Sequence, residues 1–88
     1  MKIEILIIDD SLEIGEALQI IMQNLGFACK YFDSAEKAMP YFQNELNPVI
    51  FLDIFMPNQN GLDLLPTIKK ISPFTQVVMM TGESDIEN

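Results

Sequence analysis

Blocks of apolar residues alternate with polar segments along the chain, and their lengths indicate strands and helices in turn. Short, unbroken apolar runs that end abruptly at polar side chains are typical of strands buried on both faces of a parallel sheet. The predicted strands are 3–8, 27–32, 49–52 and 76–80. Between them the apolar residues recur at helical spacing, so the sequence predicts an α/β fold with right-handed crossovers.

Three predicted helices connect these strands. The first begins near Ser11, the second is capped by either Asp33 or Ser34, and the third begins at Gly61. Each has an apolar face: Ile14, Leu18, Ile21 and Leu25 in the first, Ala35, Ala38, Phe42 and Leu46 in the second, and Leu62, Leu65 and Ile68 in the third. Gly26 ends the first helix. Pro40 predicts a kink or a delayed start in the second helix, and Pro66 is unusual inside the third.

Composition and charge narrow the classes of function. The 88 residues are 49% hydrophobic, enough for one small domain with a packed core. Thirteen acidic residues against five basic ones give a net charge of −8, which disfavours direct binding to nucleic acids or anionic membranes. No run is long enough to span a membrane, and the start does not have the pattern of a signal peptide. Cys29, the single cysteine, is expected to be a buried apolar residue, and we expect a cytoplasmic protein.

Three of the predicted strands end at side chains that bind metals or contact phosphates. Asp9 and Asp10 follow the first strand, Asp53 follows the third, and Thr81 follows the fourth. The carboxyl ends of parallel strands meet at one edge, where ligands bind. Two carboxylates about 4 Å apart repel by on the order of 4 kcal/mol at an effective dielectric constant of 20, so such a site requires a cation or a proton. Oxygen ligands alone suit Mg²⁺, and a carboxylate beside Mg²⁺ suggests phosphoryl transfer onto an aspartate.

These residues lie in segments that resemble the response-regulator receiver domain, the CheY-like family. The segments are Asp9-Asp10, FLDIFMPNQNG from Phe51 to Gly61, and VVMMTG from Val77 to Gly82. The resemblance covers the chain in order and implies a flavodoxin-like, doubly wound parallel sheet. Helix 4, strand 5 and helix 5 of the family fold have no counterpart here, so we expect the strand order 2-1-3-4. A capping-box spacing at 84–87 predicts a further helix that is cut short, and we interpret 1–88 as the N-terminal portion of a single receiver domain.

The resemblance implies a role for each polar residue at this edge. Asp53 would accept the phosphoryl group, and Thr81 would hydrogen-bond that group and move toward it, with Gly82 leaving room. The expected Mg²⁺ ligands are Asp9, Asp10, Asp53 and the backbone carbonyl of Phe55, with Asp10 binding directly and Asp9 mainly through water. A structural alternative remains for each residue, since Asp9 and Asp10 would also serve as helix caps and threonine is common at strand ends.

The chain also departs from the family pattern. The family's lysine after strand 5 has no match, because the lysines occur only at 2, 30, 37, 69 and 70. We therefore expect phosphorylation of this chain alone to be slow or absent. We also expect self-association, either through the bare edge of the fourth strand or through the sheet face that the fifth helix covers in the family. The ring of Phe55, where the family can carry a polar residue, should hinder attack by water.

The sequence thus predicts a phosphoacceptor module of a two-component system, and not a turnover enzyme. Its expected partners are a histidine kinase or phosphotransfer protein, or a small phosphodonor, and a C-terminal effector domain in the full protein. The alternative is a degenerate or truncated receiver that acts as a phosphate-independent interaction module. A Mg²⁺-dependent phosphatase is disfavoured because the second acid of such enzymes would fall at Phe55.

Overall fold

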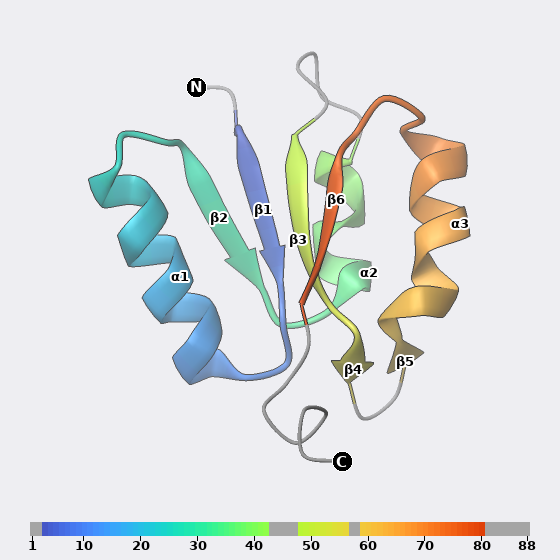
Figure 1. The fold of residues 1–88 in the computed structure, drawn as a ribbon, viewed down its shortest axis with the longest axis horizontal. Helices are drawn as coiled ribbons and strands as arrows, with labels where there is room; N and C mark the ends of the chain where they lie inside the picture. The colour runs from blue at the N-terminus through green and yellow to red at the C-terminus, as the bar shows by residue number, and fades with distance from the viewer. Residues whose placement is uncertain (1–2, 43–47, 57–58, 81–88) are drawn as a thin grey trace.

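The computed structural model describes residues 3–42, 48–56 and 59–80, and within them four parallel strands form one sheet (Figure 1). The strands are β1 (Ile5–Ile8), β2 (Cys29–Phe32), β3 (Val49–Asp53) and β6 (Val77–Met80). Their order is β2-β1-β3-β6, which matches the predicted order 2-1-3-4 because β6 is the fourth long strand of the chain. The α/β class and the doubly wound parallel topology are therefore confirmed.

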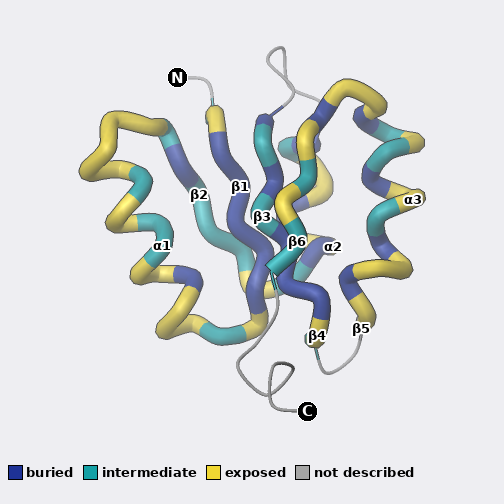
Figure 2. Tube along the Cα trace, in the orientation of Figure 1, coloured by how far each residue is buried: buried dark blue, intermediate teal, exposed yellow. Residues whose placement is uncertain are grey.

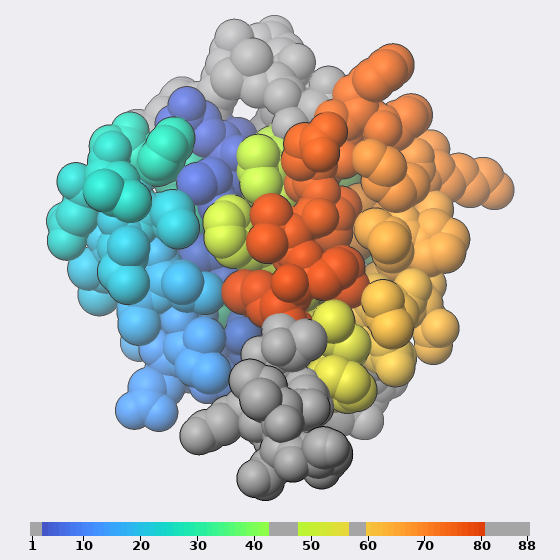
Figure 3. Space-filling model, viewed as in Figure 1, coloured from blue at the N-terminus to red at the C-terminus, as the bar shows by residue number. Residues whose placement is uncertain are grey.

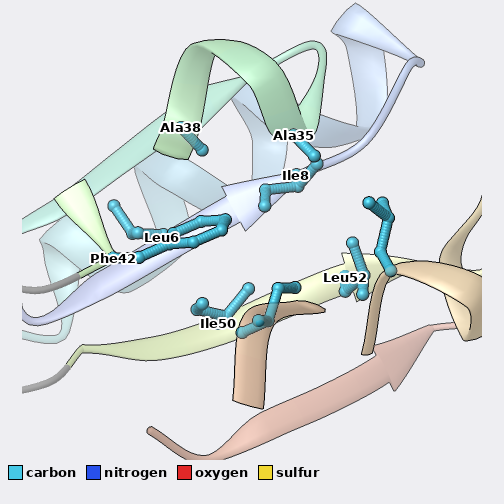
Figure 4. Packing of buried hydrophobic residues seen from close by; sticks show 9 residues of the cluster. Leu6, Ile8, Ala35, Ala38, Phe42, Ile50 and Leu52 are labelled. Carbon is cyan, nitrogen blue, oxygen red and sulfur yellow. The ribbon is translucent and has the colours of Figure 1, made fainter. Parts of the chain in front are cut away.

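The helices lie on the two faces of this sheet: α1 (Leu12–Asn24) on one, and α2 (Ala35–Ala38) and α3 (Gly61–Ile71) on the other. Alternate residues of β1 contact opposite layers. Leu6 and Ile8 join a cluster with α2 and α3, whereas Ile5 and Ile7 face α1 with Cys29. Figure 4 shows the larger cluster, whose buried members are Leu6, Ile8, Ala35, Ala38, Phe42, Ile50, Leu52, Leu64 and Ile68. Cys29 is buried as predicted, and burial raises the pKa of its thiol to about 11.

The strands of the sheet are buried to different degrees. Every residue of β1 is buried, whereas Val78 in the middle of β6 is 43% exposed (Figure 2). The helix α1 contacts β2 and β1. The side chains of β3 and β6 are visible between α1 and α3 in Figure 3. Among the described residues, therefore, no helix covers the β3–β6 half of the sheet on the α1 side.

The rotation of α1 about its axis differs from the prediction. Ile14 and Ile21 are each 50% exposed and Leu25 is 66% exposed, although all three belong to the apolar face read from the sequence. Leu18, the fourth residue of that predicted face, does pack against the sheet, and it does so together with Met22, which was not predicted. The reason is Gly15, which is buried and lies directly against the ring of Tyr31, so this side of the helix must face β2.

The apolar face of α3 is also partly different from the prediction. Ile68 is fully buried as expected, but Leu62 is 54% exposed and Leu64 is buried in its place. The helix begins at Gly61, which is held against the backbone of Asp53, and this contact sets which residues turn inward. Pro66 lies on the exposed side, where the loss of one backbone hydrogen bond is tolerated.

The region around Pro40 confirms the predicted irregularity. The α-helix α2 ends at Ala38 and continues as a short 3₁₀ helix over Met39–Tyr41 that contains Pro40. Phe42, which follows it, is buried in the core. Leu46, which we placed on the same helix face, lies outside the described residues.

A short antiparallel ladder follows β3, in the segment between the third predicted strand and the third predicted helix. Its strands are β4 (Phe55–Met56) and β5 (Gln59–Asn60). The Gly61 N–H donates a hydrogen bond to the Ile54 carbonyl at 2.6 Å and closes the ladder directly onto α3. None of the described helices combines the length and apolar character that a membrane crossing needs. The helix predicted at 84–87 lies outside the described residues.

Candidate metal and phosphoryl site

Three carboxylates converge at the carboxyl edge of the sheet. One oxygen from each of Asp9, Asp10 and Asp53 lies within 4.8 Å of the other two. The parallel register explains the meeting, since Ile8 pairs with Leu52 and the acids follow directly in both strands. Asp9 is 5% exposed and Asp53 is 8% exposed, while Asp10 faces solvent. The group is thus a partly buried acidic site that is open at Asp10.

The backbone and side chain of Asp9 are held from three directions. Its N–H donates to the Phe32 carbonyl at 3.1 Å, and its Oδ1 accepts the Ser11 N–H at 2.8 Å. Its carbonyl oxygen accepts the Tyr31 hydroxyl at 2.7 Å. The helix α1 is capped by Ser11, whose side chain accepts the Ile14 N–H at 3.3 Å. The acid pair is therefore not the N-cap of this helix.

Asp53 has an unusually high pKa for an aspartate. Burial is the largest cause of a rise to about 6, and the negative charge of Asp9 and the contact with Asp10 raise it further. The Phe55 N–H, which donates to Asp53 Oδ1 at 3.1 Å, acts in the opposite direction but does not outweigh burial. The carboxylates thus destabilise one another unless a proton or a cation is present.

Gly61 allows the chain to pass close behind Asp53. A Cβ atom at Gly61 would overlap the Asp53 carbonyl oxygen and would lie 2.8 Å from the Ile54 Cα. Asn60 caps the helix that starts here, with its Oδ1 accepting the Leu62 N–H at 2.8 Å. Asn60 therefore fixes the start of α3 directly after the close approach to Asp53.

Of the other predicted site residues, Phe55 lies within the described part of the chain and Thr81 and Gly82 do not. The side chain of Phe55 is 53% exposed and comes two residues after Asp53. The strand β6 ends at Met80, which pairs with Asp53. Thr81 and Gly82, which come next in the sequence, lie outside the described residues.

The surroundings of the acid pair also include Tyr31 and Gly15, which the sequence patterns did not indicate. Tyr31 is in β2 and reaches Asp9 through its hydroxyl, while its ring packs on Gly15. A glycine in the first turns of a helix, opposite a strand that carries an aromatic residue, was the available signal. Gly is unfavourable inside helices, so its presence indicates a close contact.

The acidic set fits a hard divalent cation. The three residues offer oxygen atoms only, and Mg²⁺ is normally bound by one or two carboxylates together with water and phosphate oxygens. The sequence contains no histidine, and its single cysteine, Cys29, is not in this group, so the group offers no ligand that favours a softer metal.

Comparison with known proteins identifies the family. The model of the response regulator receiver domain matches residues 5–88, which is nearly the whole chain. The chain therefore belongs to the response regulator receiver domain family, a class of signalling modules.

Curated relatives share about a third of their residues with this chain over the matched region. The DNA-binding transcriptional regulator NtrC of Klebsiella pneumoniae is 32% identical over 81 residues, covering 92% of this chain and 17% of its own length. The regulatory protein VanRc of Enterococcus gallinarum is 31% identical, covering 97% of this chain and 36% of its own length. The chain thus spans about a third or less of these relatives.

Solved structures show the same fold. The response regulator receiver domain protein of Clostridium thermocellum has a TM-score of 0.80 and 31% identity, covering 98% of this chain and 70% of that one. NtrX of Brucella abortus has a TM-score of 0.82 and 31% identity, covering 99% of this chain and 20% of that one. These TM-scores show that the chain shares its fold with the matched parts of both structures.

Proposed function

We propose that this chain is a phosphoacceptor module of a two-component system and that Asp53 is the residue phosphorylated. The observation that carries the proposal is the convergence of Asp9, Asp10 and Asp53 at one edge, in a chain of the receiver family. An Asp53 carboxylate oxygen would form a bond to phosphorus while the bond from phosphorus to the donor breaks. The leaving group of the donor would keep the electron pair of that bond.

The proposed metal ligands are Asp9, Asp10, Asp53 and the carbonyl of Phe55. A bound Mg²⁺ would neutralise the charge that builds up on the phosphoryl oxygens during transfer. Asp10 is the exposed member of the acidic set and is available for direct coordination. Asp9 is held by the Ser11 N–H, which supports a role through water. Thr81 is proposed to hydrogen-bond the phosphoryl group, a role supported by the pairing of Met80 with Asp53.

The proposal extends to the domain and its partners. Residues 1–88 would be the N-terminal portion of one receiver domain, supported by the 98% and 70% coverage in the comparison with the Clostridium structure. The donor would be a histidine kinase or phosphotransfer protein, and the location would be the cytoplasm. A C-terminal effector domain is supported by the much greater length of the curated relatives, two of which are named as regulators.

The decisive experiment is intact-mass analysis after incubation with Mg²⁺ and acetyl phosphate. Because the family's lysine after strand 5 has no match here, we expect the wild type to gain one phosphoryl group slowly or not at all, and Asp53→Asn to gain none. A gain that persists in Asp53→Asn would contradict the assignment of the acceptor. If neither protein gains mass, the same test on a longer chain that continues past residue 88 separates a receiver that needs further residues from the alternative below.

The second candidate is a phosphate-independent interaction module. It is favoured by the positions of three lysines, each of which is engaged away from Asp53. Lys37 pairs with Asp33 at 3.0 Å, Lys69 donates to the Thr75 carbonyl at 2.6 Å, and Lys30 lies over the rings of Phe32 and Tyr41. A longer chain that still gains no phosphoryl group would favour this candidate.

We also propose that the chain associates with a second copy through β6 and the neighbouring β3 surface. The supporting observations are the 43% exposure of Val78 in mid-strand and the visible side chains of both strands in Figure 3. Among the described residues, β6 pairs with β3 on one side only. Apolar surface and an open strand edge favour contact with another chain.

A further inference from the structure

One hydrogen bond joins the outer strand of the sheet to the acid pair. The Tyr31 hydroxyl, on β2, donates to the Asp9 carbonyl oxygen at 2.7 Å across 22 positions of sequence. That carbonyl belongs to the peptide unit that links Asp9 to Asp10. Because a peptide unit is planar and rigid, fixing its oxygen also fixes where the chain leaves toward the Asp10 side chain.

The other contacts of this turn do not replace that bond. The Phe32 carbonyl holds the N–H of Asp9, and the Ser11 N–H holds its carboxylate. These two bonds hold the N–H and the side chain of Asp9, and neither holds the carbonyl of the Asp9–Asp10 peptide unit. Asp9 is 5% exposed, so little water is available to replace a lost donor.

The position of the Tyr31 ring is itself fixed by α1. Its edge atoms occupy the space that a side chain at residue 15 would fill, and the ring Cζ would lie 2.6 Å from a Cβ atom there. Gly15 is buried at this contact. The ring is thus clamped between β2 and the first turns of α1, with the hydroxyl directed at the acid pair.

The hydroxyl keeps its proton in this setting. Burial and the negative charges of Asp33, Asp9, Asp10 and Glu16 raise the pKa of Tyr31 above its ordinary value of 10. The residue therefore acts as a hydrogen-bond donor throughout the physiological range, and its bond to Asp9 does not switch with pH.

We propose that Tyr31 is a positioning residue for the acidic site, which holds the Asp9–Asp10 peptide unit in the orientation that lets both carboxylates bind one cation. The inference rests on the proposed function, because the site it orients is the proposed Mg²⁺ site. Gly15 supports the same arrangement by leaving room for the ring. The role is indirect, since Tyr31 contacts the backbone of Asp9 and not the cation.

The test compares Tyr31→Phe with the wild type by two measurements. Groups that orient metal ligands typically change affinity by about 10- to 100-fold, so we expect Mg²⁺ binding, measured by NMR titration, to weaken about 10-fold. We also expect the Ser11 amide, whose bond to Asp9 Oδ1 depends on this turn, to exchange its hydrogen several-fold faster in the absence of metal. Tyr41→Phe is the matched control, because Tyr41 stacks on Phe32 and should leave both values unchanged.

Each outcome has one meaning. Unchanged exchange at Ser11, or unchanged Mg²⁺ affinity beside normal wild-type binding, would overturn the positioning role. Absence of Mg²⁺ binding by the wild type would contradict the proposed metal site. The exchange rate of the Ser11 amide would still show whether Tyr31 holds the turn.

A second variant addresses the ring. Gly15→Ala keeps the hydroxyl but displaces the ring that carries it, so it should act in the same direction as Tyr31→Phe. The double variant should then weaken Mg²⁺ binding less than the product of the two single effects. Fully independent effects on Mg²⁺ binding would show that Gly15 does not act through Tyr31.

Discussion

Asp53 pairs with Met80 at the last position of β3 and β6, and the Ile54 N–H donates to the Met80 carbonyl at 2.9 Å. The pairing links the end of β6 to the acidic site, although the two residues are far apart in sequence. Any movement of this end of β6 must therefore change the backbone contacts directly beside Asp53. The acidic site and the partly exposed strand belong to one structural unit.

The raised pKa of Asp53 predicts how stability depends on pH in the absence of metal. A carboxyl group whose pKa rises from 3.8 to about 6 binds protons more tightly in the folded state, so stability falls as the pH rises through that interval. Above pH 6 the charged Asp53 carboxylate therefore lowers the free energy of unfolding, by about 3 kcal/mol at most. Asp53→Asn removes this destabilising charge. We expect the variant to be more stable than the wild type at pH 7.5 and nearly equal to it at pH 3.8.

Urea unfolding at both pH values measures this difference. Addition of Mg²⁺ at pH 7.5 should stabilise the wild type and have little effect on Asp53→Asn, because the cation replaces the proton in neutralising the site. A variant that is less stable than the wild type at pH 7.5 without metal would contradict the argument.

Gly61→Ala tests the close approach behind Asp53. The added Cβ would overlap the Asp53 carbonyl oxygen, and backbone atoms cannot move away as a flexible side chain can. We expect a loss of about 1–3 kcal/mol in the free energy of unfolding, as for other overpacked sites. Thr67→Ala, at an exposed position of the same helix, is the control and should change stability by less than about 0.5 kcal/mol. Equal stability of the two variants would show that the helix start shifts without cost.

Phe55→Asn tests whether the exposed ring protects a phosphoryl group on Asp53. The ring comes two residues after the acceptor and is apolar, whereas an amide could orient an attacking water. In a phosphorylated chain that continues past residue 88, we expect the variant to lose its phosphoryl group several-fold faster. The decay is followed by intact mass after removal of the donor. Equal lifetimes would mean that the ring does not limit access of water.

Val78→Lys tests the proposed self-association. Val78 is 43% exposed on β6, and a lysine there would place a strongly hydrated charge in the contact. We expect the wild type to form dimers in sedimentation experiments at high micromolar concentration and the variant to remain monomeric. Thr67→Lys introduces the same charge on the exposed side of α3 and should dimerise like the wild type. A monomeric wild type would refute the proposal.

Much of this arrangement could be predicted because it depends on where the strands end. The short apolar runs predicted the parallel sheet. The polar residues that follow these runs predicted that Asp9, Asp10 and Asp53 lie close together. These features follow from the two-residue period of strands and from the common edge of parallel strands. The predicted strand positions therefore needed only small corrections at their ends.

The rotation of α1 could not be predicted in the same way, because apolar spacing alone does not show which neighbour a helix faces. The helical spacing of Ile14 and Ile21 predicted that both face the sheet. The contact between Gly15 and Tyr31 rotates the helix so that both are half exposed instead. The bond from Tyr31 to Asp9 depends on this rotation. The rotation of α1 thus depends on a long-range contact between a glycine and an aromatic ring, which the local apolar pattern does not show.

The chain contains no tryptophan and two tyrosines, so its intrinsic fluorescence comes from Tyr31 and Tyr41. Only Tyr31 is hydrogen-bonded to the acid pair in the described part of the chain, while Tyr41 lies against Phe32 with ring centres 5.1 Å apart. A Tyr41→Phe protein would therefore emit from a single ring beside the acidic site. Cation binding to that protein could be followed optically, without any attached label.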